Sequence, residues 1–307
     1  MVNMVEDAGV TVYCHAWGSE ALMEGNRVIG VTFQSKEGRK AILAGKVIDC
    51  TGDGDIFASA GCAYEKEYSG DDRSYNVSVV FRLGNVDSEE FRNWKYDPNS
   101  HYRDKLAEYK KLFGYRISPF VTPMKDIMWV NNFVEGKDCC NVQDLTDTEM
   151  LIRRSLNEGI EWIRENVPGF KNAFLHDTAP QLGTRGSRRL NGTYRLTMDD
   201  IAQTIEHEDT IAIIPAHRRM KYKSPIELPY GVMLPADDVE DLLAAGRCFS
   251  SAHDANDHAN LIPHCVALGE AAGAAAALAL QSNTTFRNVD VKKVQQMLKK
   301  QGVYLPR

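Results

Sequence analysis

The first sixty residues alternate between short apolar runs and turn residues, which is typical of a small α/β unit. An opening helix is expected to end at Gly9, because glycine is the usual stop signal after a helix. The run at 46–50 is apolar enough for a buried strand, and it leads into Thr51-Gly-Asp-Gly-Asp55. The pattern predicts strands at 10–15, 27–34, 40–43 and 46–50, a hairpin turn at 36–39 and a short helix at 56–60.

The middle of the chain has a different pattern, with longer helical periods and more aromatic residues. Thr146 and Glu149 have the spacing of a capping box, so Thr146 is the expected N-cap of a long helix. Apolar positions from Leu151 to Ile163 give that helix one apolar face, and Pro168-Gly169 is expected to end it. The pattern also predicts a strand at 76–83, helical structure at 88–113 and an aromatic-rich loop at 120–133.

Near the C-terminus the α/β pattern returns. A strand is predicted at 241–246, a polar, histidine-rich loop at 250–262, an alanine-rich helix at 263–280 and a last helix at 291–301. The fold class is therefore α/β with an α+β insert. The expected divisions are 1–75 for the first part of the α/β unit, 76–235 for the insert and 236–307 for the completion of the α/β unit.

Composition and charge narrow the class of protein. A formal net charge of −6 and a pI near 5.8 argue against a nucleic-acid partner, which favours a basic surface. The N-terminus lacks the pattern of a signal peptide, and the longest apolar stretch is too short to cross a bilayer. A cytoplasmic protein with no membrane partner is expected. The seven cysteines have no C-x-x-C spacing, and no metal motif is indicated.

Three segments could carry chemistry. The strand ending in Thr51-Gly52 brings backbone to the edge where ligands of α/β sheets bind, although an ordinary Asp/Gly turn fits about equally well. The strand, Gly246 and the following helix N-terminus would form an anion site, with a surface loop before a core helix as the alternative. The arginines at 185, 188 and 189 suit an anionic ligand, but a salt-bridged basic turn is the more usual explanation of such a cluster.

Together these segments resemble a known family. VIDCTGDGD at 47–55, the helix at 144–170, QLGTRGSRRLNGTYRLT at 181–197 and the segment at 241–278 are similar to the FAD-dependent oxidoreductases. Within them, the resemblance is to the class of fumarate reductase and succinate dehydrogenase flavoproteins, in its soluble bacterial branch. It implies a Rossmann-like FAD-binding domain interrupted by a substrate or cap domain.

The resemblance also implies roles for particular residues. The Thr-Gly turn would lie against the FAD, the Gly246-Arg247 strand end would approach its ribitol and ring, and the last helix N-terminus would face the ring. Arg185 and Arg188 would hold a small polar or anionic substrate, and His253 or Tyr230 would move the proton that accompanies hydride transfer to or from flavin N5. The implied FAD-binding residues are Thr51, Gly52, Asp53, Gly246, Arg247, Ser250, Leu261 and Ile262.

The sequence departs from the family pattern in three places. Gly186 stands where similar sequences carry Glu, and Asn260 where many carry Arg. The third departure is that residues 1–307 contain no G-x-G-x-x-G fingerprint for the FAD pyrophosphate. The Rossmann-like domain is therefore expected to be incomplete, with the missing N-terminal half a possible partner chain. The alternative to an enzyme is a non-catalytic, partner-binding fragment of a split or truncated flavoprotein.

Overall fold

The computed structural model describes residues 2–66, 77–203, 205–215 and 225–306. The chain forms two compact units, the first made of Met1–Lys66 with Arg188–Arg307 and the second of Glu67–Ser187. Residues 188–235 were expected in the insert, but they belong to the first unit. The reason is a contact over long sequence distance, because β13 (Thr210–Ile214) of this segment packs on helix α8 (Ile262–Gln281) near the C-terminus.

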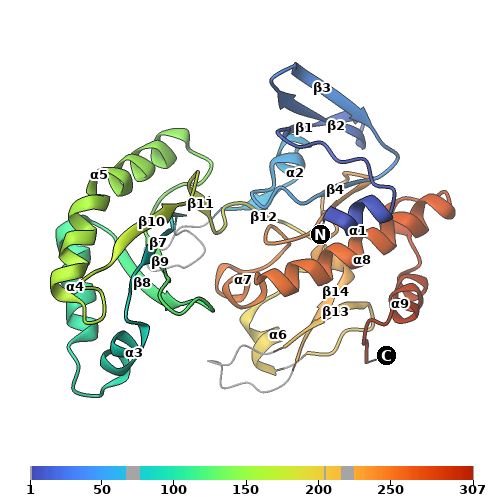
Figure 1. Cartoon of the computed structure of the whole chain (residues 1–307). Coiled ribbons are helices and arrows are strands. Elements are labelled where there is room, and N and C mark those ends of the chain that lie inside the picture. The colour runs from blue at the N-terminus through green and yellow to red at the C-terminus, as the bar shows by residue number, and fades with distance from the viewer. Residues whose placement is uncertain (1, 67–76, 204, 216–224, 307) are drawn as a thin grey trace. The chain divides into compact units, whose positions relative to one another are not determined.

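The first unit begins with α1 (Val2–Asp7) and an antiparallel sheet of order β1-β2-β3 (Figure 1). The strands are β1 (Trp17–Glu24), β2 (Arg27–Ser35) and β3 (Gly38–Leu43). The strand expected at 10–15 is wrong, and β1 starts at Trp17 instead. A tight turn at Gly25 and Asn26 sets the pairing from Glu24–Arg27 to Trp17–Gln34, so that earlier residues have almost no strand left to pair with.

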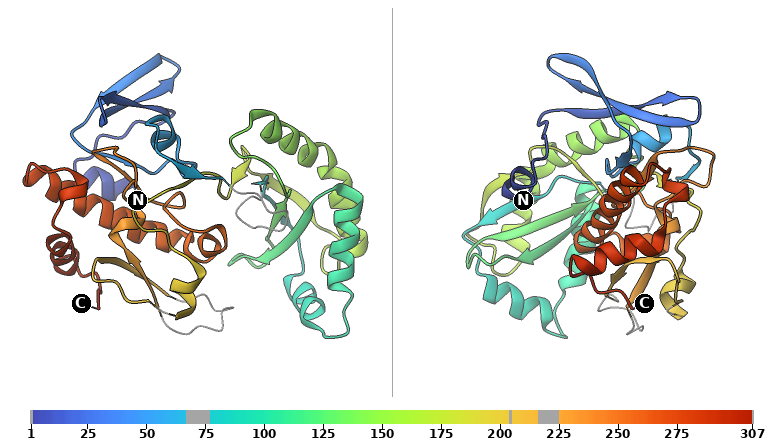
Figure 2. Two further views of the ribbon diagram at one scale, coloured as in Figure 1. Left: turned by 180° about the vertical axis from the view of Figure 1, so that it is seen from behind. Right: turned by 90° about the vertical axis from the view of Figure 1, so that its right-hand side faces the viewer.

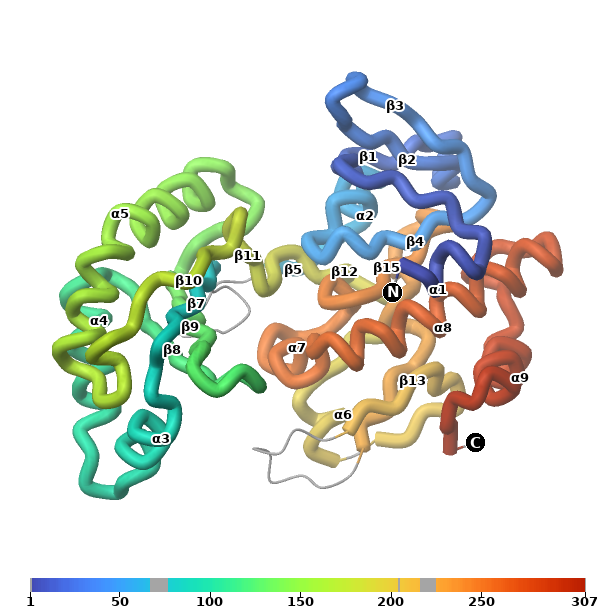
Figure 3. The backbone as a smooth tube through the Cα atoms, in the orientation of Figure 1, coloured from blue at the N-terminus to red at the C-terminus, as the bar shows by residue number. Residues whose placement is uncertain are grey.

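Two parallel strands from opposite ends of the sequence form the centre of the first unit (Figure 3). Strand β4 (Val47–Asp49) pairs with β15 (Leu242–Ala244), Val47 opposite Leu242. Their amino ends are joined by charge, since the buried Asp241 forms ion pairs with Lys46 (Nζ to Oδ1, 2.6 Å) and with Arg27 (Nε to Oδ2, 2.7 Å). Both strands therefore start together and also end together.

The remaining elements of the first unit surround this pair. The expected polar loop at 250–262 is wrong in part, since its centre folds into α7. The chain from His253 to Ala259 can do so because Ala255 and Ala259 provide a buried face on one side of a short helix. The elements are α2 (Asp55–Ser59), β5 (Tyr64–Glu65) paired with β12 (Arg189–Leu190), α6 (Met198–Gln203), β13 (Thr210–Ile214) paired with β14 (Ile226–Pro229), the short 3₁₀ turns Tyr230–Val232 and Phe286–Asn288, α7 (His253–Ala259), α8 (Ile262–Gln281) and α9 (Val291–Lys300).

Helix α8 is the main core helix of the first unit. It contacts β4, β13 and α9, and both views in Figure 2 show α9 beside its C-terminal half. Leu268, Ala272 and Ala275 lie on its buried face. Among the described helices, only α8 is long and apolar enough to cross a membrane, and a buried face of this kind is what a core helix presents.

The second unit is a four-stranded antiparallel sheet of order β10-β7-β9-β8 with helices on one side (Figure 1). The expected aromatic-rich loop at 120–133 is wrong, because most of it forms two paired strands. The elements are β6 (Val77–Ser78), β7 (Phe81–Gly84), α3 (Ser88–Tyr96), α4 (Tyr102–Phe113), β8 (Arg116–Val121), β9 (Met128–Phe133), α5 (Val142–Asn166), β10 (Phe174–Thr178) and β11 (Gly183–Thr184), which pairs with β6.

The two faces of this sheet have different roles. Alternate residues such as Phe81, Met128 and Val130 are buried in a core with residues of α4 and α5. Between β6 and β7, the side chain of Asn132 accepts from Val79 N at 2.9 Å and donates to Val79 O, which replaces the strand pairing that is interrupted there. None of the described helices covers the opposite face, which carries a row of polar and aromatic side chains.

Candidate functional site

The carboxyl ends of β4 and β15 form one edge of the parallel pair. Because the strands run side by side in register, the turn after Asp49 and the turn after Ala244 leave the sheet at the same place. Ala245 N donates to Asp49 O at 2.9 Å, so the pairing continues one residue beyond the strands. Ligands of open α/β sheets bind at such an edge.

Asp49 builds the turn that follows β4. Its side chain is buried, and Oδ1 accepts from Thr51 N at 2.9 Å and from Thr51 Oγ1 at 2.7 Å. Its Oδ2 accepts from Ile56 N at 3.0 Å and from Phe57 N at 2.9 Å, which lie in the first turn of α2. A single carboxylate therefore fixes both ends of the Thr51–Asp55 turn, and four hydrogen bonds satisfy it.

Gly52 and Arg247 bring the two turns into contact. Gly52 has φ 83°, and a Cβ there would lie 2.6 Å from Cζ of Arg247. The guanidinium thus lies directly over the glycine, and its Nη2 donates to Asp53 Oδ2 at 3.0 Å. Thr51, Gly52, Asp53 and Arg247 form one cluster, although nearly two hundred residues separate the two turns.

Beyond Arg247, the chain leads to the N-terminus of α8. Asn256 Nδ2 donates to Arg247 O at 3.0 Å, which ties α7 to this edge. Burial raises the pKa of the Cys265 thiol in the first turn of α8, and the positive charge of Arg247 partly opposes that shift. Leu261 and Ile262 are exposed at this helix end, which has no side-chain cap.

Arg188, which directly precedes β12, also belongs to the cluster. Its Nη2 lies 2.7 Å from Asp55 Oδ1, and its guanidinium lies over the Tyr64 ring at 5.7 Å. Burial raises the pKa of Asp55, an effect that the charge of Arg188 opposes. The cluster therefore holds two guanidiniums and two carboxylates around a glycine turn.

A model of the family described as FAD dependent oxidoreductase matches residues 1–298. The chain belongs to the FAD-dependent oxidoreductase family. FAD is the cofactor of this family, and the chain, like other members, has an α/β fold. No curated protein matches the sequence.

Solved structures that are similar to this family member include two flavin-dependent halogenases. A triple mutant of the flavin-dependent brominase Bmp2 superposes with a TM-score of 0.44 at 12% identity, covering 97% of this chain and 58% of the brominase. The myxobacterial chondrochloren halogenase CndH superposes with a TM-score of 0.44 at 11% identity, covering 98% of this chain and 53% of the halogenase. The chain thus spans just over half the length of either structure.

The edge has features that fit an FAD group. Gly246 has φ 90°, and no atom lies within 4 Å of the position of a Cβ there, so backbone is open to a ligand. The neighbouring α8 end offers amide groups and a helix dipole that favour negative charge. Among the described residues, no group of three His, Cys, Asp or Glu side chains is arranged to hold a metal ion.

The other expected site residues differ in position. His253 is half-buried at the start of α7, and Ser250 is fully buried, with its Oγ accepting from Gly192 N at 3.0 Å. Tyr230 does not reach the carboxyl edge. Its hydroxyl donates to Phe286 O at 3.0 Å, and Phe286 lies under Lys46, which precedes β4 at the opposite end of the pair. Burial raises the pKa of Tyr230.

Arg185 belongs to the second unit, where it lines a cavity on the open face of the sheet. The expected pair Arg185 and Arg188 is therefore divided, with one arginine in each unit. Asp49 was not predicted as a site residue. The feature of the sequence that could have identified it is an acidic residue in the last position of an otherwise apolar strand, just ahead of a Thr-Gly turn.

Proposed function

We propose that this chain is an FAD-dependent oxidoreductase of the fumarate reductase and succinate dehydrogenase flavoprotein class, acting on a small polar or anionic substrate. FAD supplies the hydride acceptor or donor, N5 of its ring. The observation that carries the proposal is the shared carboxyl edge of β4 and β15, where Gly52 meets Arg247 and where Asn256 of α7, the helix just before α8, binds Arg247 O.

Each residue of the edge has a proposed task. Thr51, Gly52 and Gly246 offer backbone without obstruction, and Asp53 holds Arg247 in place over the turn. Leu261 and Ile262 present the amides of the α8 end, and Ser250 contributes through backbone because its hydroxyl is already bound to Gly192. His253 is the proposed proton carrier, and Tyr230 is not, since its hydroxyl lies in the core.

Gly246→Ala tests the proposed cofactor site. The added methyl group meets no protein atom, so it would intrude only on a bound FAD. We expect FAD affinity to fall about fivefold to a hundredfold, as for overpacking of about 1–3 kcal/mol. The measurement is titration of the purified chain with FAD, followed by flavin fluorescence.

Gly38→Ala is the matched control. Gly38 also has a positive φ, 101°, and open space around it, but it lies in the β2–β3 hairpin. Equal loss of FAD affinity in both variants would overturn the proposed location. If the wild-type chain binds no FAD even at saturating concentration, the alternative is favoured, a non-catalytic, partner-binding role.

A further inference from the structure

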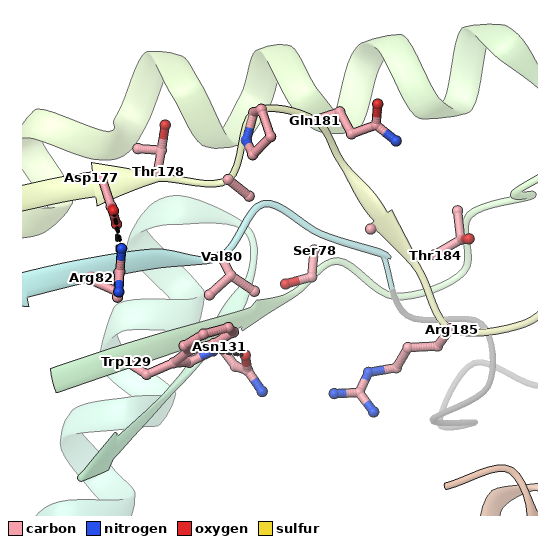
Figure 4. Close-up of a pocket in the computed structure, with 13 residues that line it drawn as sticks. Ser78, Val80, Arg82, Trp129, Asn131, Asp177, Thr178, Gln181, Thr184 and Arg185 are labelled. Carbon is pink, nitrogen blue, oxygen red and sulfur yellow. Dashed lines mark hydrogen bonds and ion pairs between the residues drawn. The ribbon is translucent and has the colours of Figure 1, made fainter. Parts of the chain in front are cut away.

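The open face of the sheet in the second unit carries a cavity of about 560 Å³ (Figure 4). Small-molecule sites usually have about 300–1,000 Å³, so the size suits a small organic ligand. Strand alternation forms its floor, because every second residue of a strand points to the same face. The segment from β6 to β7 contributes Ser78, Val80 and Arg82, and β9 contributes Trp129 and Asn131. The segment 177–185 forms the rim.

Ser78 is the most informative residue in this cavity. Its side chain is more than nine-tenths buried, and its Oγ has no hydrogen-bond partner. A buried hydroxyl without a partner costs about 1–3 kcal/mol. Figure 4 shows that Oγ points into the cavity, so a ligand atom there would satisfy it.

Asn131 provides a second donor with a fixed orientation. Trp129 Nε1 donates to Asn131 Oδ1 at 2.6 Å, which assigns the oxygen of the amide to the indole side. The amide nitrogen is then the atom directed away from Trp129, and Figure 4 shows it on the side of Arg185. The cavity therefore presents N–H groups at this point and not a carbonyl oxygen.

Arg185 adds a positive charge beside these donors. Its guanidinium lies over the Phe133 ring, 5.1 Å from the centroid, and such a contact orients the group. The other arginine in the cavity, Arg82, is bound to Asp177. Arg185 lines the cavity beside Ser78 and Asn131, as Figure 4 shows.

Trp129 provides a flat apolar wall next to the donors. Its side chain is 43% exposed although it lies at the centre of the sheet face. An indole that is open on one side is a stacking surface for a planar group. The cavity therefore combines an oxyanion site with an aromatic wall.

We propose that this cavity binds a small planar organic acid, with its carboxylate on Ser78, Asn131 and Arg185 and its flat group on Trp129. The assignment of that acid as the substrate rests on the proposed function, whereas binding itself depends only on residues of the second unit. A guanidinium and two neutral donors suit one carboxylate.

Benzoate is the probe, and calorimetric titration of the purified chain is the measurement. We expect Arg185→Gln to weaken benzoate binding about tenfold to a hundredfold and Ser78→Ala about threefold to tenfold. Arg116→Gln is the matched control. Arg116 also lies over Phe133, at 5.3 Å, but it is bound to Glu135 and does not line the cavity.

Ser78→Ala separates a ligand contact from a structural role. Because the hydroxyl has no partner, its removal should leave the melting temperature unchanged or raise it while benzoate binding weakens. Benzamide, which is neutral, and cyclohexanecarboxylate, which is not planar, should both bind more weakly than benzoate. The proposal fails if benzoate does not bind, if benzamide binds equally well, or if Arg116→Gln weakens binding as much as Arg185→Gln.

The outcome is independent of flavin binding. A chain that takes up FAD but does not bind benzoate would overturn this inference and leave the proposed function standing. A chain that binds benzoate through Arg185 but does not bind FAD would support the cavity assignment and overturn the proposed function.

Discussion

Gly52 is the residue at which the two halves of the first unit meet. Its positive φ requires a glycine or a strained side chain, and the guanidinium of Arg247 occupies the space where a Cβ would lie. Two constraints therefore favour glycine at this position: the positive φ of its own backbone, and the guanidinium of a residue far away in the sequence. Gly246 also has a positive φ, but no side chain occupies the space where its Cβ would lie.

Gly52→Ala should destabilise the FAD-free chain more than Gly246→Ala. Both variants carry the cost of about 1–2 kcal/mol for a left-handed residue, but only Gly52→Ala also displaces Arg247 from Asp53. Urea unfolding of both variants measures the difference. Equal losses of unfolding free energy would show that Arg247 moves aside without cost.

Some residues of the site could be predicted from the sequence, and others could not. An apolar strand followed by Thr51-Gly52 identifies a turn at a sheet edge, because local chemistry determines it. The interior position of Tyr230 depends on Phe286, 56 residues further along the chain, which no local pattern reveals. The role of Asp49 was missed because a strand-end carboxylate is more often a ligand or a surface group.

Among the helices, α5 shows how a start signal can be misread. Asn141 Oδ1 accepts from Gln143 N at 2.9 Å and from Asp144 N at 3.2 Å, so the N-cap lies five residues before the expected Thr146. Thr146 Oγ1 instead donates to Val142 O at 2.7 Å within the helix. Glu149 binds Arg153 and not the backbone of Thr146, so the spacing of the capping box is coincidental.

Asn141→Ala should lower the free energy of unfolding by about 1 kcal/mol, as expected for loss of an N-cap. Thr146→Ala, the control, removes no cap and should cost clearly less. Chemical denaturation followed by far-UV circular dichroism provides the comparison. The reverse order of the two losses would contradict the assigned cap.

Strands β8 and β9 were missed for a different reason. Their open face carries Phe120, Trp129 and Phe133, so the sequence does not alternate between apolar and polar positions there. Aromatic residues on the open face conceal the period of two that identifies a strand. One of these residues, Trp129, also lines the cavity of the second unit.

For the whole molecule, the two units are expected to differ in how their stability changes with acid, because their carboxyl groups have pKa shifts of opposite direction. In the second unit, a hydrogen bond from Arg82 lowers the pKa of Asp177. Hydrogen bonds from the backbone of Asp138 and from the side chain of Lys137 lower the pKa of Asp144. Partial burial alone would raise the pKa of Glu135, but Lys110 and Arg116 lower it. In the first unit, Asp55 has a raised pKa, mainly through burial.

These directions predict that acid destabilises the second unit more than the first. Carboxylates with a lowered pKa stabilise the folded state above the unfolded value near pH 4, and that contribution is lost as the pH falls through their folded values. Asp55 has the opposite sign, because its stabilising contribution is present at low pH and is lost as the pH rises. The effects are small, since the paired groups are largely exposed.

Tryptophan fluorescence can follow this difference, because Trp94, Trp129 and Trp162 lie in the second unit and only Trp17 in the first. Thermal melts between pH 7 and about pH 3.5 should show a falling fluorescence midpoint. Asp177→Asn should reduce the slope of midpoint against pH. A midpoint that is independent of pH would contradict the assigned shifts.

The alternating sides of β9 also have an evolutionary consequence. Point substitutions at Trp129 or Asn131 alter the ligand that the cavity accepts, while Met128 and Val130 continue to hold the core on the reverse side. A single inserted or deleted residue would exchange the two sets and destroy both. Selectivity in this part of the molecule can therefore diversify through replacement of side chains, whereas the length of the strand must stay constant.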